Sequence, residues 1–426
     1  MNPNGFSFIH AADLHIDSPL RGLDAYDGAP VERLRGATRQ ALVALVDLAL
    51  ERQVAMVLLA GDIYDGDWAD FRTGLFFREQ MVRLVRAGIQ VFVIKGNHDA
   101  ESQISRQLPA LDGVHVFSAH RSETVDLAGI GAAVHGRSFP NRAVPEDLLP
   151  TYPPPLPGRF NIGLLHTSLT GRPGHDPYAP TTPQALVATG YDYFALGHVH
   201  AREVVHESAP RIVYPGNLQG RRAGEAGAKG CELVTIENGL IVSAEFVALD
   251  VVRWQTLSLD ASGLDRIETI ATRFREQASA LVAGARDRLH ALRVVLTGET
   301  PLHRVEAAQP GTLAAAVQAA AQEIDEAEVW IESVRLALRA PLTREQAAEH
   351  SDALGELLQL TDALLADPDG LKAWAQEQLG ALGPLPPQLS DADPRTLDGE
   401  ALAALIRDAE ATVLARVRAA DDEAPE

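Results

Sequence analysis

The feature that most constrains this chain is an apolar run that ends on a glycine and an acid. Residues 54–60 read as a β-strand and are followed at once by Gly61 and Asp62. A strand that ends in this way places one carboxylate at the mouth of a sheet, where it can point at a ligand. Four more fragments follow short hydrophobic runs in the same manner: Asp13-Leu-His15, Gly96-Asn-His-Asp99, Leu165-His166 and Gly197-His-Val-His200. We expect these five strand ends to build one metal site at the rim of a single core.

The order of the expected elements indicates an α/β fold. Strands are expected at 6–10, 54–60 and 89–94, and helices between them at 31–53 and 71–87. A β-α-β-α-β order is typical of a sheet covered by helices, and such sheets bind ligands at the carboxyl ends of their strands. From residue 114 the pattern changes to short strands with glycine turns. We therefore expect a two-layer β-sandwich core flanked by helices, α+β overall.

The length of 426 residues favours two or three domains. We expect a metal-site domain at 1–250 and a small α+β domain at 251–341, because a second β-α-β-α-β pattern follows a change of composition near residue 250. Residues 342–426 are expected to hold two amphipathic helices, at 350–366 and 402–417, with a Gly-Pro-Leu-Pro-Pro linker between them and an acidic tail.

The composition of the chain indicates in which compartment we expect the protein. The single cysteine, Cys231, excludes an intrachain disulfide and favours a reducing compartment. The first residues do not resemble a secretion signal, and no run approaches the ~20 apolar residues that span a bilayer. We expect a soluble, cytoplasmic protein. The net charge of −21 counts mildly against DNA as substrate without excluding it, since bound metal supplies local positive charge.

Asp, Asn and His side chains at one sheet edge fit phosphoester hydrolysis. That reaction needs a nucleophilic hydroxide near neutral pH and charge relief on the phosphate oxygens. Two divalent metals about 3.5–4 Å apart provide both. Mixed nitrogen and oxygen ligands suit Mn²⁺, Fe²⁺ or Zn²⁺ better than Mg²⁺ or Ca²⁺.

The five fragments also carry a family resemblance. Their order along the chain resembles that of the calcineurin-like metallophosphoesterases: D-x-H, G-D-x-x-D, G-N-H-D, a lone histidine and G-H-x-H. More narrowly, the chain resembles the SbcD/Mre11 group of DNA repair exonucleases and, within it, the bacterial YhaO-like exonucleases. The segments that carry the narrower resemblance are FIHAADLHIDSPL, GDIYDGD, GNHDAES, GHDPYAP, YDYFALGHVH, YPGNLQGR and VVRW. The resemblance covers residues 6–255 well and the remainder in outline.

The resemblance implies two metal sites that share Asp62. One metal would be held by Asp13, His15, Asp62 and His200, and the second by Asp62, Asn97, His166 and His198. His98 would bind no metal; it would protonate the leaving oxygen or stabilise the transition state, with Asp99 orienting its ring. The implied activity is that of a Mn²⁺-dependent nuclease, with Fe²⁺ or Zn²⁺ as other possible metals.

Five further residues are candidate substrate contacts: His135, Arg137, His175, Arg221 and Arg222. Surface solvation is the ordinary explanation of an arginine pair. Many relatives have a histidine where Arg222 stands, a departure that concerns substrate detail and not the metal site.

Partners are implied by the resemblance as well. The sequence has no G-x-x-x-x-G-K-[ST] phosphate loop, so we expect no ATPase activity of its own. The resemblance implies an SbcC/Rad50-like or YhaN-like ATPase bound at the C-terminal helices. It also implies a homodimer formed through 71–87 or 102–111, and a small α+β domain that guides DNA to the metals.

Two other hypotheses remain. The first is a metallophosphoesterase for a small phosphodiester or phosphomonoester, which the acidic surface fits slightly better and the long extension after residue 250 fits less well. The second is a non-catalytic scaffold, which the intact ligand set disfavours.

Overall fold

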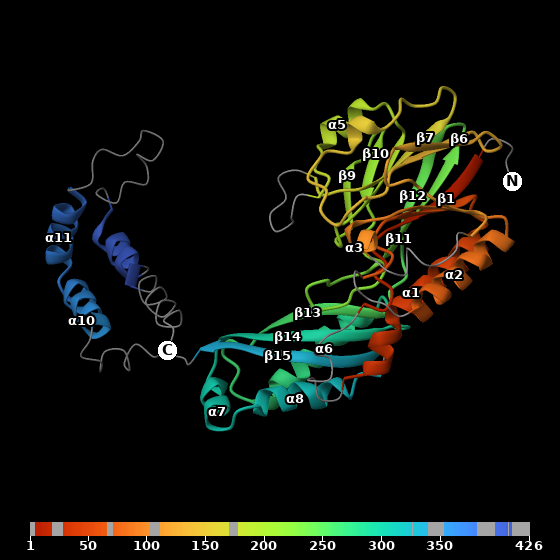
Figure 1. Ribbon diagram of the computed structural model, residues 1–426. Coiled ribbons are helices and arrows are strands. Elements are labelled where there is room, and N and C mark those ends of the chain that lie inside the picture. Colours follow the sequence, from red (N-terminus) through yellow and green to blue (C-terminus); the bar gives the residue numbers. More distant parts are fainter. Residues whose placement is uncertain are drawn as a thin grey trace. The chain divides into compact units, whose positions relative to one another are not determined.

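A computed structural model describes residues 5–18, 29–65, 71–101, 111–169, 178–325, 327–339, 353–380, 397–407 and 409–410. The chain forms two compact units, residues 1–339 and 340–426. Sheets are described only in the first of these units, and helices in both (Figure 1).

The first sheet has six strands in the order β12-β11-β1-β2-β3-β4. Its parallel strands are β1 (Gly5–Ala11), β2 (Met56–Ala60), β3 (Gln90–Ile94) and β4 (Val114–Val116). An antiparallel pair, β11 (Gly230–Glu237) and β12 (Leu240–Ala248), continues it beyond β1. Helices α1 (Val31–Arg52) and α2 (Phe71–Arg86) cover its outer face. Successive side chains of a strand point to opposite faces of the sheet. Ile9 and Val57 therefore pack against the helices, whereas Phe8 and Leu58 point toward the second sheet.

The second sheet lies against the inner face of the first. It has six strands in the order β5-β6-β7-β8-β10-β9. Their bounds are β5 (Glu123–Leu127), β6 (Ala132–Gly136), β7 (Phe160–His166), β8 (Tyr193–Gly197), β9 (Glu203–His206) and β10 (Arg211–Tyr214). Phe8, Phe92, Ile162 and Tyr193 belong to the apolar layer between the sheets. The short helix α5 (Pro183–Ala188), the 3₁₀ turn η2 (Leu149–Thr151) and their loops cover the outer face. The predicted two-layer β-sandwich flanked by helices is confirmed.

A third sheet follows, with its own core. Strands β13 (Val252–Asp260), β14 (Leu289–Glu299) and β15 (Glu328–Arg339) are all parallel. Helices α6 (Ile267–Val282), α7 (Leu302–Ala308) and α8 (Thr312–Ala321) connect them, and Phe274 and Val317 of these helices pack with Leu259 and Val294 of the sheet. The predicted β-α-β-α-β order is present here, with α7 in addition.

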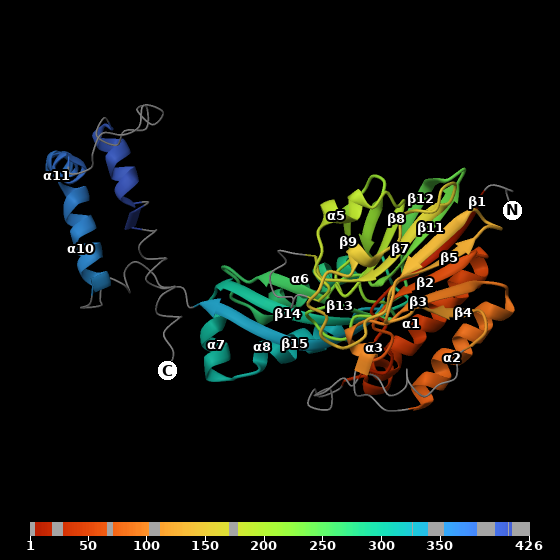
Figure 2. The same ribbon diagram turned by 45° about the horizontal axis from the view of Figure 1, so that its top comes forward.

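The third sheet is joined to the rest of its unit through a small apolar cluster. Leu34 and Ala37 of α1 pack with Trp254 and Trp330, whose ring centroids are 6.0 Å apart. The indole Nε1–H of Trp254 also donates to the carbonyl oxygen of Gly220 at 2.9 Å. The two views in Figures 1 and 2 show this sheet beside the amino-terminal part of α1.

The second unit is described as helices only. They are α10 (Ala353–Ala366), α11 (Pro368–Gly380) and a segment at 399–407. Leu371, Ala375 and Leu402 form its apolar core. Helix α11 was not predicted. The expected linker at 383–387 and the acidic tail lie outside the described residues. Among the described helices of the whole chain, none has the length and apolar character needed to cross a membrane.

Candidate metal centre

The predicted ligand residues come together at one edge of the sandwich. Asp13 and His15 follow β1, Asp62 follows β2, Asn97 opens α3 (Asn97–Glu101) after β3, His166 ends β7, and His198 and His200 follow β8. The carboxyl ends of parallel strands in both sheets meet here. The loops after β1 and β2 run together, since the backbone N–H of Asp13 donates to Gly61 and that of His15 to Asp62, both at 3.0 Å.

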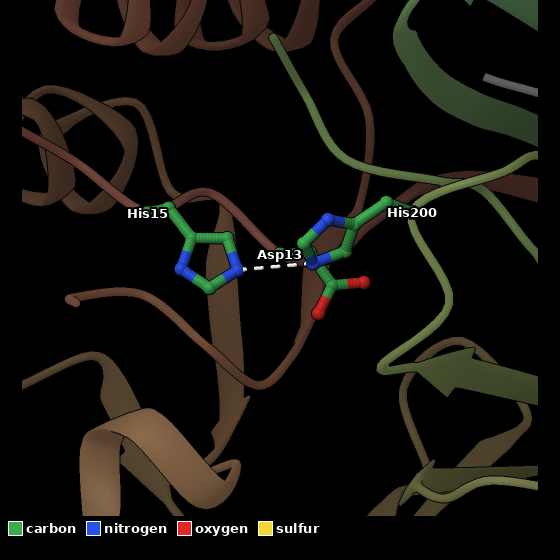
Figure 3. Close-up of side chains that lie close together, drawn as sticks. All are labelled: Asp13, His15 and His200. Carbon is green, nitrogen blue, oxygen red and sulfur yellow. Dashed lines mark hydrogen bonds between the residues drawn. The ribbon is translucent and has the colours of Figure 1, made fainter. Parts of the chain in front are cut away.

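Asp13, His15 and His200 form the first cluster (Figure 3). Nε2 of His15 and Nε2 of His200 face each other at 3.2 Å. The other ring nitrogen of His200, Nδ1, lies 3.0 Å from a carboxylate oxygen of Glu225. Because a carboxylate only accepts, Nδ1–H donates to it and a neutral His200 directs the lone pair of Nε2 into the cluster. This geometry fits a cation.

Asp62, His166 and His198 form the second cluster. Nδ1–H of His166 donates to the carbonyl oxygen of Ala60 at 2.9 Å, so Nε2 faces Asn97 Oδ1 at 3.0 Å and Asp62 Oδ2 at 3.4 Å. The same Oδ2 lies 3.9 Å from Nε2 of His15 in the first cluster. One oxygen of Asp62 therefore faces both clusters.

The charges of the site compensate one another. Burial alone would raise the pKa of Asp62, but the neighbouring His166, His15 and His98 lower it. Burial alone would lower the pKa of His166, but Asp62 and Asp13 raise it to about 9. A proton on His166 would offset the charge of one buried carboxylate, and a divalent cation bound among these side chains would take its place. The donor set fits divalent cations.

Several residues of the ligand loops have positive φ angles. Asp13, His15, Asp62 and His198 have φ of 52°, 42°, 53° and 103°. Residues other than glycine rarely adopt positive φ, at roughly 1–3 kcal/mol each, and such residues cluster at functional sites. These angles turn side chains from two sheets toward one point.

The glycines before the ligands are required by close packing. A Cβ at Gly96 would lie 2.3 Å from Oδ1 of Asp62, and one at Gly197 would lie 1.9 Å from the carbonyl oxygen of Ala60. Ligand side chains and backbone therefore occupy the space that any other residue needs. This explains why Gly precedes Asn97 and His198.

His98 is oriented by Asp65. Nδ1 of His98 lies 2.8 Å from Oδ1 of Asp65, and this hydrogen bond raises the pKa of His98. The expectation that Asp99 orients this ring was wrong. Asp99 accepts hydrogen bonds from the backbone N–H groups of Ile63, Tyr64 and Gly96 and so ties the ligand loops together.

Comparison with known proteins identifies the family. Residues 6–202 match the profile of the calcineurin-like phosphoesterases, and residues 254–339 match that of the middle domain of the metallophosphoesterase YhaO. The chain is 34% identical over 340 residues to the uncharacterized metallophosphoesterase YhaO of Bacillus subtilis, which covers 78% of this chain and 81% of that protein. The chain belongs to the calcineurin-like metallophosphoesterases. As a member, it is a metal-dependent phosphoesterase.

This metallophosphoesterase is also similar to a DNA repair protein. The DNA double-strand break repair protein Mre11 of Methanopyrus kandleri is 25% identical over 273 residues, which are 57% of this chain and 56% of that protein. Among solved structures, a dimetal phosphatase from Danio rerio aligns with 55% of this chain and 93% of its own at 14% identity and a TM-score of 0.34.

A cleft in front of the metallophosphoesterase centre is lined by Asp62, His98, His198 and His200. Of the candidate substrate contacts, Arg222 lines this cleft and is largely exposed. Arg221 lies behind it, donating to Ser18 and Glu225. His175 is outside the described residues.

Two other candidates lie away from the cleft. His135, a candidate substrate contact, is buried between Thr124 and Asn161 and stacks on Tyr191; it is a structural residue of β6. Arg137 donates to Thr151 Oγ1 at 3.2 Å and is not among the lining residues.

Sequence reasoning missed several residues around this centre. Arg142 and Tyr178 line the cleft, and Glu225 contacts His200. Asp65 is the second acid of the Gly-Asp-Ile-Tyr-Asp motif, and that spacing was a usable signal. Glu225 stands in no ligand-type spacing and had no such signal.

Proposed function

We propose that this metallophosphoesterase is a Mn²⁺-dependent DNA nuclease, acting as an exonuclease, a single-strand endonuclease or both, in DNA repair. The observation that carries the hydrolytic part is the single oxygen of Asp62 that faces two ligand clusters. The similarity to a DNA double-strand break repair protein supports DNA as the substrate.

We assign Asp13, His15, Asp62 and His200 to one metal ion, and Asp62, Asn97, His166 and His198 to the other. The mixed nitrogen and oxygen ligands favour Mn²⁺, with Fe²⁺ or Zn²⁺ as alternatives. When bound, such a metal pair supplies charge stabilisation for the phosphoryl oxygens and a nucleophilic water near neutral pH.

The protein's own groups complete the reaction in this proposal. His98 lines the cleft and delivers a proton to the leaving oxygen, while Asp65 holds its Nδ1 and so directs Nε2 outward. Arg142 and Arg222 also line the cleft, where guanidinium groups suit the phosphates of a strand.

The alternative is a phosphoesterase for a small phosphodiester or phosphomonoester. The net charge of −21 favours it slightly, because a polyanion is repelled by an acidic surface. The third sheet beside the sandwich favours a larger substrate, since small-molecule hydrolysis needs no such addition.

We propose partners on the same basis. An SbcC/Rad50-like or YhaN-like ATPase would bind the helical second unit, and the residues of the third sheet would guide DNA to the metals. A homodimer through 71–87 is proposed as well, and Phe71 and Leu75 of α2 expose apolar side chains there. The other proposed dimer segment, 102–111, lies almost wholly outside the described residues.

The test uses purified protein with linear single- and double-stranded DNA, in Mn²⁺ and in EDTA, with bis(p-nitrophenyl) phosphate as a small substrate. Asp62→Asn removes the shared ligand, and Asp126→Asn, an exposed acid on β5 paired with Arg159, is the matched control. We expect Mn²⁺-dependent DNA cleavage that is lost in Asp62→Asn and kept in Asp126→Asn. Hydrolysis of the small ester with intact DNA would favour the alternative.

A further inference from the structure

Glu225 is a buried carboxylate outside every motif, and it contacts a proposed metal ligand. Its side chain is 5% exposed, and Oε1 accepts Nδ1–H of His200 at 3.0 Å. Oε2 accepts from the side-chain amide of Asn217 at 2.8 Å and from the backbone N–H of Arg221 at 2.9 Å. Glu225 is thus fixed on both oxygens and has little freedom to turn away from His200.

Arg221 extends this support to the other side of the centre. Its guanidinium donates to Oε1 of Glu225 at 3.3 Å and to Oγ of Ser18 at 3.1 Å, and lies 3.6 Å from Oδ2 of Asp65. Ser18 donates to the same Oδ2 at 2.5 Å. Asp65 in turn holds the ring of His98. One arginine therefore lies between the carboxylate that holds a metal ligand and the carboxylate that holds His98.

The loop at 217–225 that carries these two residues is anchored on the third sheet. Gln219 accepts from the backbone N–H groups of Val251 and Val252 at 2.8 and 3.2 Å, and donates to the carbonyl oxygen of Val252 at 2.6 Å. Trp254 donates to the carbonyl oxygen of Gly220. The loop thus connects β13 to the metal centre.

We propose that Glu225 and Arg221 are positioning residues: Glu225 fixes the tautomer and direction of His200, and Arg221 keeps Asp65, and through it His98, in place. This rests on the proposed role of His200 as a metal ligand. A carboxylate behind a ligating histidine orients the ring and raises its basicity, and its loss typically weakens metal binding about 10- to 100-fold.

The test for Glu225 measures Mn²⁺ binding by isothermal titration calorimetry, without any nucleic acid. Glu225→Ala is expected to weaken one of the two Mn²⁺ ions about 10- to 100-fold, and Glu225→Gln less, because its carbonyl still accepts from Nδ1. The control is Glu232→Ala, which removes another buried acid, on β11, that accepts a hydrogen bond from Arg202. It is expected to lower the Tm and leave both Mn²⁺ affinities unchanged.

Wild-type affinity at both ions in folded Glu225→Ala overturns the proposal. If Glu225→Ala does not fold, Glu225→Gln decides: a several-fold loss at one ion supports the proposal, and unchanged affinity overturns it. Because DNA is absent from the experiment, a protein that cleaves no DNA still gives a clear result.

The test for Arg221 uses steady-state hydrolysis of the dinucleotide TpT, a small phosphodiester whose alkoxide leaving group, unlike p-nitrophenolate, needs a proton. Arg221→Lys keeps the charge and loses the planar fork that reaches two carboxylates. We expect kcat to fall about tenfold, which is less than the full contribution of a positioned proton donor. KM and both Mn²⁺ affinities should be unchanged. A raised KM with unchanged kcat would show that Arg221 binds substrate instead and would overturn its positioning role.

Discussion

Gly96 leaves no room for a side chain, because the oxygen of Asp62 and the ring of His166 already fill the space above its Cα. The motif G-N-H-D is therefore a packing requirement as much as a set of ligands. Single residues at strand ends were predictable here because each follows an apolar run. The direction of a ring was not predictable, since Asp65 and Asp99 are both close to His98 and only the fold decides which carboxylate it meets.

Gly96→Ala tests this packing requirement. The added methyl group would push Asp62 or His166 out of place, so we expect Mn²⁺ affinity to fall at least tenfold, in line with the strong coupling of ligand orientation to metal binding. Gly129→Ala is the control, because a Cβ there meets nothing within 4 Å. Equal Mn²⁺ affinity of the two variants by calorimetry would contradict the account.

Asp65→Asn tests the orientation of His98. An asparagine keeps the size of the side chain but removes the charge that holds Nδ1–H, so the proton donor is misplaced. We expect kcat for a small phosphodiester to fall about 10²-fold, with two Mn²⁺ ions still bound per chain. Asp126→Asn, on the exposed edge of β5, should leave kcat unchanged. Unchanged kcat in Asp65→Asn would remove Asp65 from the mechanism.

Between elements, His10 connects the two sheets of the sandwich. Its Nε2–H donates to the carbonyl oxygen of Leu196 at 3.1 Å and its Nδ1 accepts from the hydroxyl of Tyr193 at 3.0 Å, which joins β1 to β8. Strands and long helices were predicted well because apolar periodicity identifies buried faces. Helices α7 and α11 were missed, since short or weakly amphipathic segments carry little of that signal.

The buried His10 predicts a loss of stability in acid. Burial lowers the pKa of His10 from 6.5 to about 3. Between these values the unfolded chain binds a proton that the folded chain does not, so the free energy of unfolding falls as pH falls from 6.5 to 3. The full effect is roughly 5 kcal/mol.

The measurement is urea unfolding in EDTA at several pH values. His10→Gln keeps a donor for Leu196 and cannot titrate, so its free energy of unfolding should depend less on pH across this window. His120→Gln, at an exposed position, should keep the wild-type slope. Identical slopes for wild type and His10→Gln would contradict the prediction.

For the whole molecule, all residues of the proposed centre lie in the first compact unit, residues 1–339. The net charge of −21 did not reveal this centre. The groups that partly offset the charge of its carboxylates act only locally. Glu225 could not be identified from the sequence either, since it stands in no motif and its loop is held at the site by hydrogen bonds to Val252 and Trp254.

A chain truncated after Arg339 should keep its metal centre. We expect two Mn²⁺ ions per chain and a kcat for bis(p-nitrophenyl) phosphate within about twofold of the full chain, because compact units of this size fold by themselves. Loss of Mn²⁺ binding in a folded truncated chain would show that the helical unit contributes to the centre. A change in DNA cleavage alone would show that the helical unit acts in substrate or partner binding.

The most direct test of the central claim is anomalous diffraction from crystals grown with Mn²⁺, recorded above and below the manganese absorption edge. The account predicts two anomalous peaks per chain. One should be coordinated by Asp13, His15 and His200, the other by Asn97, His166 and His198, and Asp62 should bridge them. A single peak, or peaks away from these side chains, would contradict a dinuclear centre built at the five strand ends.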